Sequence, residues 1–167
     1  MEKEITEVYC GNGRGKTTLA IGQALRASSQ GKSVIIIQFL KGNERRELDF
    51  LEELDQLDIK IFRFEKMETC YDQLNEEEQA EEERNILNGL NFARKAIATQ
   101  ECDFLVLDEI LGLLDKHIAT VDMVVGLLKQ KDESMHLILT GNRVDPGILD
   151  YVDSVTTITT LGREQNS

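Results

Sequence analysis

The sequence has few of the features that mark secreted, membrane-bound or metal-stapled proteins. Its three cysteines, Cys10, Cys70 and Cys102, are odd in number and show no CxxC spacing, which argues against a disulfide framework or a zinc knuckle. No apolar run reaches the roughly 18 residues that span a bilayer, and the N-terminus lacks the apolar core of a signal peptide. We therefore expect a cytoplasmic protein without a membrane segment.

Positive charge is also scarce. The 167 residues include 19 Lys plus Arg against 31 Asp plus Glu, so the net charge at pH 7 is −12. Such a charge opposes non-specific nucleic-acid binding, which depends on basic side chains that face phosphates. We expect no nucleic-acid partner, and any anionic ligand must meet a local pocket of hydrogen-bond donors.

Repeats and low-complexity linkers are absent and Pro146 is the only proline, so we expect one domain over residues 1–167. Short apolar, β-rich runs alternate with longer helical patterns, and most of the runs are apolar at consecutive positions, as in strands covered on both faces. This alternation predicts an α/β fold of the P-loop NTPase (RecA-like) type, with a mostly parallel sheet flanked by helices. The predicted strands are Glu7–Cys10, Ser33–Leu40, Ile59–Phe64, Phe104–Leu107, His136–Thr140 and Ser154–Thr159.

Helical spacing predicts two long helices, over residues 17–29 and about 75–99, and a short one that starts at Asp145-Pro146. The first turns of the second helix are rich in glutamate, which the helix dipole favours there, and we expect these side chains to form a solvated face. The expected buried faces are Leu19, Gln23, Ala24 and Ala27 in the first helix, and Ile86, Leu90, Ala93 and Ile97 in the second. The glutamates are Glu76, Glu77, Glu78, Glu81, Glu82 and Glu83.

The strongest functional signal is a glycine-rich loop between the first strand and the first helix. Alternating glycines let the backbone present N–H groups to phosphate oxygens, Lys16 adds a positive charge, and the Thr17 hydroxyl stands where Mg²⁺ is usually held. Cys10 takes the place of the first glycine in GxxxxGK[ST], so the loop is a variant, and we expect Cys10 to be a buried small residue. The predicted phosphate-binding residues are Gly11, Asn12, Gly13, Arg14, Gly15, Lys16, Thr17 and Thr18.

A second signal is the apolar strand that ends in Asp108 and Glu109. Parallel strands deliver their carboxyl ends to one edge of the sheet, so these acids are expected near Lys16 and Thr17 and able to hold Mg²⁺ or Mn²⁺. We expect one acid to bind the metal and the other to organise the loop, an assignment that the pattern leaves open. The residues up to this point fit a nucleotide-dependent hydrolase, kinase or transferase, or a non-catalytic nucleotide-binding module.

Other candidates carry weaker signals. Arg26, on the first helix, could reach a nucleotide or could simply be exposed. Arg45 and Arg46 follow the second strand at the edge where ligands bind, where they assist an anionic substrate or only pair with neighbouring glutamates. His117 and His136 have no spacing typical of a metal site or a catalytic triad, so we expect structural roles for both.

Four segments, in the same order along most of the chain, resemble the ATP:corrinoid adenosyltransferases of the CobA/CobO/BtuR type. They are GNGRGKTTLAIGQALRA, VIIIQFLKG with the nearby ERREL, FLVLDEI, and LTGN followed by ILDYVDSVT. The resemblance implies transfer of the 5′-deoxyadenosyl group of ATP to the Co(I) of a corrinoid, such as cob(I)yrinic acid a,c-diamide, with release of tripolyphosphate. An ATPase or small-molecule kinase that releases ADP, and an ATP or corrinoid carrier without turnover, are the alternatives.

The resemblance also implies roles for individual residues and partners. Lys16, Thr17 and Glu109 become the catalytic residues, because the loop, the lysine and a metal held by Thr17 and Glu109, with Asp108 beside them, stabilise the departing triphosphate. Arg26 matches a phosphate-contacting arginine. A flavoprotein electron donor and a homodimer are further expectations.

Three departures from the family pattern fall on the side of the presumed corrinoid. The family's Phe-Thr-Trp-like segment corresponds loosely to residues 66–71, where Phe64 or Tyr71 would have to supply the aromatic ring, since the chain has no Trp. The family's Thr-Gly-Arg reads Thr140-Gly141-Asn142-Arg143 here. A C-terminal KHPF-like motif is missing.

Overall fold

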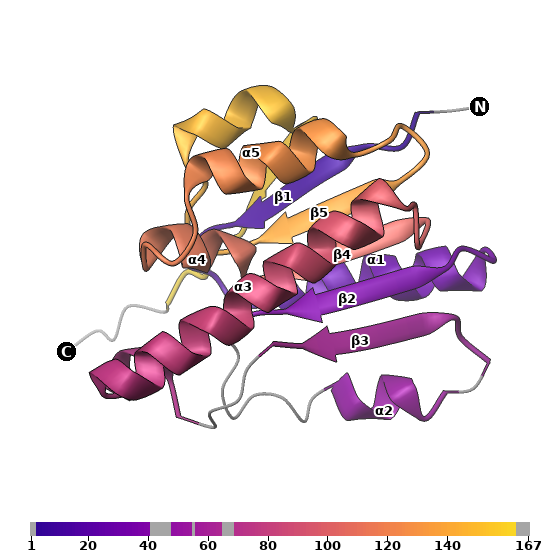
Figure 1. Cartoon of the computed structure of the whole chain (residues 1–167). Helices are drawn as coiled ribbons and strands as arrows, with labels where there is room; N and C mark the ends of the chain where they lie inside the picture. Colours follow the sequence, from indigo (N-terminus) through magenta and orange to yellow (C-terminus); the bar gives the residue numbers. More distant parts are fainter. Residues whose placement is uncertain (1–2, 41–47, 55, 65–68, 163–167) are drawn as a thin grey trace.

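The computed structural model describes residues 3–40, 48–54, 56–64 and 69–162 of the chain. Within these residues, six strands form one sheet in the order β3-β2-β4-β5-β1-β6, and every strand pair is parallel (Figure 1). The strands are β1 (Thr6–Cys10), β2 (Val34–Gln38), β3 (Ile59–Arg63), β4 (Phe104–Asp108), β5 (His136–Thr140) and β6 (Ser154–Thr157). The helices are α1 (Lys16–Ser29), α2 (Asp49–Glu52), α3 (Glu76–Ala98), α4 (Ile110–Asp115) and α5 (Val121–Gln130), with 3-10 turns η2 (Tyr71–Gln73) and η3 (Pro146–Tyr151).

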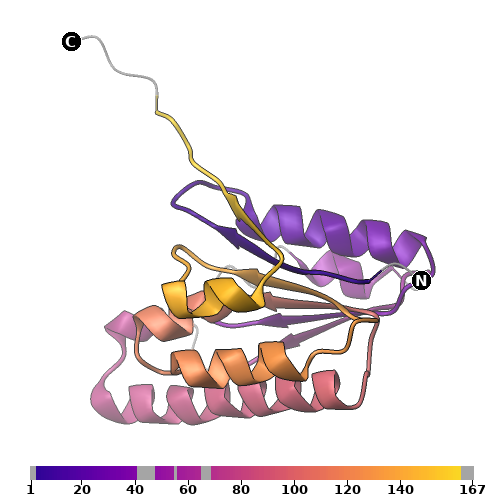
Figure 2. The same cartoon turned by 90° about the horizontal axis from the view of Figure 1, so that it is seen from above.

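Helices cover both faces of the sheet, as the continuous apolar strands predict (Figure 2). α1 and α2 pack on one face, over a buried cluster that includes Val34, Ile36 and Val106. α3, α4, α5 and η3 pack on the other, over a cluster that includes Ile37 and Leu107. The predicted α/β, mostly parallel fold class is therefore confirmed.

The strand order places the site. β5 lies between β1, which leads into the glycine-rich loop, and β4, which ends in the acidic pair. Because all strands run in the same direction, their carboxyl ends meet at one edge, and the loop, the acids and the end of β5 converge there.

The long helices agree with the periodicity, with two corrections. α3 buries Ile86, Leu90, Ala93 and Ile97 as expected, and Asn75 and Glu78 form a capping box at its start. Glu82, however, is only 2% exposed and does not belong to a solvated face. On α1 the buried side chains are Ala20, Ile21, Ala24 and Ala27, so Leu19 and Gln23 lie at the margin of the packed face.

Shorter elements differ more from the sequence prediction. β2, β3 and β6 end one to two residues earlier than expected, and α2, α4 and α5 were not predicted. Four-residue and six-residue helices such as α2 and α4 are too short to show a period, whereas α5 does carry a usable signal, since the Thr120 side chain caps it. The helix at Pro146 is a 3-10 helix, capped by Asp145 as predicted.

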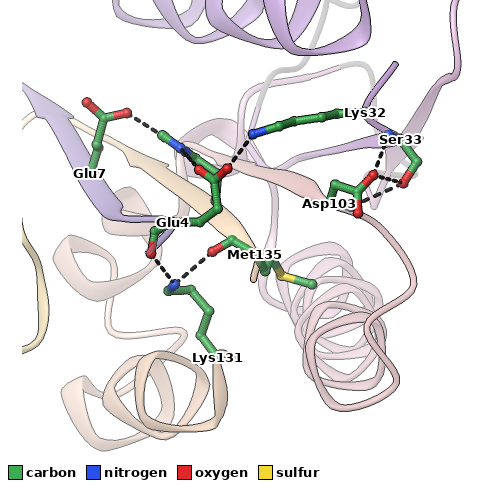
Figure 3. Close-up of polar contacts among 8 residues, drawn as sticks. Glu4, Glu7, Lys32, Ser33, Asp103, Lys131 and Met135 are labelled. Atoms are coloured by element: carbon green, nitrogen blue, oxygen red, sulfur yellow. Dashed lines mark hydrogen bonds and ion pairs between the residues drawn. The ribbon is translucent and has the colours of Figure 1, made fainter. Parts of the chain in front are cut away.

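A polar network ties the chain together at the opposite, amino edge of the sheet (Figure 3). The Glu4 carboxylate pairs with Lys32 and lies 3.2 Å from Nδ1 of His136, whose Nε2 is 2.6 Å from an oxygen of Glu7. The His136 ring also stacks on Phe104, with the ring centroids 4.6 Å apart. His136 therefore has the structural role that the sequence suggested, far from the carboxyl edge.

Candidate nucleotide and metal site

The glycine-rich loop needs glycine for two different reasons. Gly11 and Gly15 have φ values of 109° and 100°, a region that side chains disfavour. Gly11 and Gly13 also lie against the backbone of Ile158, where an added Cβ would meet the Ile158 oxygen at 2.3 Å and 2.6 Å. The alternating glycines thus allow the loop both to turn and to lie close to the segment that follows β6.

The first half of the loop is held by the segment that follows β6 and by the Lys16 side chain. The backbone N–H of Gly13 donates to the Ile158 carbonyl at 2.9 Å, and that of Arg14 donates to Oγ1 of Thr160 at 3.0 Å. Lys16 Nζ donates back to the carbonyl oxygens of Gly11 and Gly13, at 2.7 Å and 3.1 Å. Contacts within the protein therefore shape the loop.

The second half of the loop leads into the start of α1. Gly15 caps this 14-residue helix without a side-chain hydrogen bond, so the N–H groups of Lys16, Thr17 and Thr18 point out of the first turn. These donors, the positive end of the helix dipole and the Lys16 ammonium group gather at one place the chemistry that an anionic ligand needs.

Asp108, at the end of β4, is held at the centre of a buried network. It is 1% exposed, and its carboxylate accepts hydrogen bonds from Thr17 Oγ1 at 3.0 Å, Thr140 Oγ1 at 2.7 Å and Gln38 Nε2 at 3.2 Å. Arg63 in turn donates to Gln38 at 3.2 Å. Asp108 therefore links α1 to β2 and β5.

Glu109 is placed differently from its neighbour. It is half-buried, caps α4, and has a φ of 65°, the left-handed conformation that is rare for residues other than glycine. The two acids therefore point in different directions. Asp108, the last residue of β4, points into the buried network, and Glu109, the next residue, lines an open cavity.

The donor set fits a magnesium ion better than a softer metal. Thr17, Asp108 and Glu109 offer hydroxyl and carboxylate oxygens, the ligands of hard cations. Among the described residues, no group of three His, Cys, Asp or Glu side chains could hold a metal. A few protein oxygens that act together with the phosphates of a nucleotide are the usual arrangement for Mg²⁺.

A cavity of about 460 Å³ opens beside Glu109. Asn142 connects it to the phosphate loop, because Asn142 lines the cavity while its carbonyl accepts the Gly11 N–H at 2.9 Å. Tyr71 also lines the cavity, whereas Phe64 packs against Phe92 of α3, with ring centroids 5.7 Å apart. The lining residues are Leu40, Tyr71, Asp72, Glu109, Gly112, Asp115, Lys116 and Asn142.

Some candidates from the sequence are not brought to the loop. Arg26 is exposed in the last turn of α1, ten residues from Lys16 and so about 15 Å farther along the helix axis. His117 lies in a neighbouring cavity with Arg143, whose guanidinium pairs with Asp115 at 2.9 Å. Arg45 and Arg46 lie outside the described residues.

Three residues of the network were not among the sequence candidates: Gln38, Thr140 and Arg63. Gln38 and Thr140 end their strands at the same edge as Asp108, and both are nearly fully buried. The available signal was a polar residue at the carboxyl end of an otherwise apolar strand. Cys10 is buried at the end of β1, as expected, and all three cysteines are free thiols.

Comparison with known proteins decides the family. The family model described as ATP:corrinoid adenosyltransferase BtuR/CobO/CobP matches residues 2–165. The chain belongs to this family. The coarser prediction, an ATP-dependent transferase that acts on a corrinoid, is confirmed with it.

Individual relatives of the family agree. A corrinoid adenosyltransferase from Escherichia coli K12 is 31% identical over 160 residues, covering 93% of this chain and 76% of that protein. The corrinoid adenosyltransferase CobA of Salmonella typhimurium is 29% identical over 158 residues, with the same coverage.

A solved structure supports the fold alone. A KaiC-like protein from Pyrococcus horikoshii is similar with a TM-score of 0.62 at 19% identity, covering 93% of this chain and 71% of that one. Among the described residues, no helix combines the length and apolar character that a membrane crossing requires.

Proposed function

We propose that this protein transfers the 5′-deoxyadenosyl group of ATP to the Co(I) of a corrinoid and releases tripolyphosphate. The observation that carries the proposal is the cavity beside Glu109, which adjoins the phosphate loop through Asn142. A triphosphate on the loop and an acceptor in the cavity would share one edge of the sheet. We propose cob(I)yrinic acid a,c-diamide as an acceptor.

The proposed reaction is a displacement at the ribose C5′ carbon. The cobalt electron pair forms the Co–C bond while the C5′–O bond breaks, and the bonding electrons leave with the triphosphate. Negative charge therefore grows at the α-phosphate, where the loop N–H groups and Lys16 stabilise it. Co(I) is already a strong nucleophile, so no side chain needs to act as a general base.

The two acids are given different tasks. Thr17 and Glu109 would hold Mg²⁺, which when bound offsets charge on the triphosphate. Asp108 would organise the site, since its carboxylate already accepts from Thr17, Thr140 and Gln38. Tyr71 is the proposed aromatic ring on the acceptor side, because it lines the cavity with Glu109.

Arg26 is proposed as a phosphate contact from its motif position alone, and the geometry does not favour it, because Arg26 lies about 15 Å from Lys16 along α1. A cytoplasmic location, a homodimer and a flavoprotein that supplies electrons for Co(I) are likewise proposals, supported by the family resemblance. A donor that docks on a chain of net charge −12 would need a basic patch.

The test is an anaerobic assay with ATP, Mg²⁺ and chemically reduced cob(I)alamin or cob(I)yrinic acid a,c-diamide. A light-sensitive Co–C product with tripolyphosphate, lost in Lys16→Ala, is the expected result. ADP without cobalt alkylation would instead indicate an ATPase or kinase. Tight ATP binding without turnover, with Glu109→Gln altering only affinity, would indicate a carrier.

A further inference from the structure

Thr140, at the end of β5, makes hydrogen bonds to both Asp108 and Glu109. Its hydroxyl donates to Asp108 Oδ1 at 2.7 Å and accepts the backbone N–H of Glu109, also at 2.7 Å. A hydroxyl has one proton, and the amide must be the donor to Thr140, so both bonds have a fixed direction. The residue is only 1% exposed, which keeps water from replacing either bond.

The backbone that Thr140 contacts is in an unusual conformation. Glu109 has a φ of 65°, which costs free energy for a residue with a side chain and persists only where surrounding contacts impose it. This turn lifts Glu109 from the direction of Asp108 toward the cavity that it lines. The Thr140 bond to the Glu109 N–H is a contact that imposes the turn.

The packing next to Thr140 keeps β5 close to the start of α4. An added Cβ on Gly141 would meet Cβ of Leu111 at 2.4 Å, so only glycine allows the end of β5 to approach α4 this closely. The close approach brings the Thr140 hydroxyl within hydrogen-bond distance of the Glu109 backbone. Gly141 therefore allows the close approach to α4, and Thr140 makes the hydrogen bond at the start of that helix.

We propose that Thr140 is a positioning residue that fixes the direction of the Glu109 side chain, where the cavity adjoins the phosphate loop, by holding the Glu109 backbone in its left-handed turn. The inference rests on the proposed function, which gives Glu109 its metal. Thr140 is buried, and its effect would pass through Glu109.

The test compares variants that remove or keep the hydroxyl. Thr140→Val preserves shape and removes both bonds, and Thr140→Ser keeps the hydroxyl. Thr6→Val is the matched control, because Thr6 is an equally buried threonine at the amino edge of the sheet, 2% exposed. Mn²⁺ binding to the ATP-loaded protein, followed by electron paramagnetic resonance, reports on the site without any corrinoid.

Removal of a residue that orients a metal ligand typically costs 10- to 100-fold in metal affinity or activity. We expect Thr140→Val to lose Mn²⁺ affinity by roughly that factor, while its affinity for ATP without metal stays within about twofold of the wild type. Thr140→Ser and Thr6→Val should bind Mn²⁺ like the wild type. If Thr140→Val does not fold, Thr140→Ala removes the same hydroxyl with less bulk at the site.

A double variant separates action through Glu109 from action through Asp108. If Thr140 works by aiming Glu109, adding Thr140→Val to Glu109→Gln causes no further loss of Mn²⁺ affinity. Additive losses, or wild-type binding by Thr140→Val and Thr140→Ala, would overturn the inference. Absence of adenosyl transfer by the wild type would overturn the proposed function, and the Mn²⁺ measurements would still decide the role of Thr140.

Discussion

Lys16 has two tasks, and one substitution removes both. Its ammonium group donates to the carbonyl oxygens of Gly11 and Gly13, and under the proposed function the same group would contact the triphosphate. Hydrogen bonds to charged groups contribute about 1.5–3 kcal/mol, so Lys16→Ala should weaken ATP binding roughly 10- to 100-fold. Isothermal titration calorimetry measures this effect directly.

The control for Lys16→Ala is Lys60→Ala, which removes an exposed lysine from β3. It should leave the Kd for ATP unchanged. Equal losses in the two variants would mean that total charge, and not the loop, attracts ATP.

Tyr71 illustrates how local surroundings set the state of one side chain. Burial, together with a hydrogen bond to Glu83, raises the pKa of its phenol to about 12. Tyr71 therefore lines the cavity as a neutral group well beyond the pH range in which an ordinary tyrosine would ionise. Burial likewise raises the pKa of the Cys102 thiol to about 12, so Cys102 is inert as a nucleophile.

Substitution of glycine by alanine should change the melting temperature in opposite directions at two kinds of position. In the phosphate loop, Gly13→Ala places a Cβ 2.6 Å from the Ile158 oxygen, so the loop or the segment after β6 must shift. We expect a lower melting temperature and weaker ATP binding. Calorimetric melting curves with and without ATP measure both effects.

The matched variant is Gly22→Ala, in the exposed interior of α1 where nothing lies within 4 Å of an added Cβ. Glycine within a helix is about 0.5–1 kcal/mol less favourable than alanine, which corresponds to a rise of about 1–4 °C in melting temperature. A Gly13→Ala protein that melts and binds ATP like the wild type would show that the segment after β6 moves without cost.

Elements with a strong period were predictable, and those without one were not. α3 repeats its apolar residues over 23 positions, and the continuous apolar strands β2 and β4 show by themselves that both faces are covered. α4 has six residues and follows β4 with only Glu109 between them, so its apolar residues read as a continuation of the strand. Glu82 was misjudged because its burial depends on what α3 packs against.

Over the whole molecule, acid should loosen the amino edge of the sheet. The Lys32 and His136 contacts hold the pKa of Glu4 below its ordinary value of 4.5. The folded pKa is therefore lower than the unfolded one, so the stabilisation by Glu4 is complete above pH 4.5 and is lost as the pH falls through the folded pKa. The amino-edge network in Figure 3 should thus weaken in acid.

Melting temperatures of wild type and Glu4→Gln, compared across pH, measure this loss. Their difference should be largest above pH 4.5 and should shrink below it. Glu53→Gln, which alters an exposed glutamate, should show no such trend. A difference that persists unchanged in strong acid would contradict the assignment to the Glu4 carboxylate.

Features that depend on neighbours along the chain were readable from the residues alone. The loop GNGRGKTT, its position between a strand and a helix, and the acids at the end of the Phe104 strand are local patterns. With the other matched segments they indicate both the fold class and the family. The contacts that make a site of these parts join residues far apart in sequence, such as Thr17 with Asp108 and Gly13 with Ile158. Only the strand order, with β5 between β1 and β4, brings Thr140 under Glu109, because hydrogen bonds and close approaches are set by distance in space.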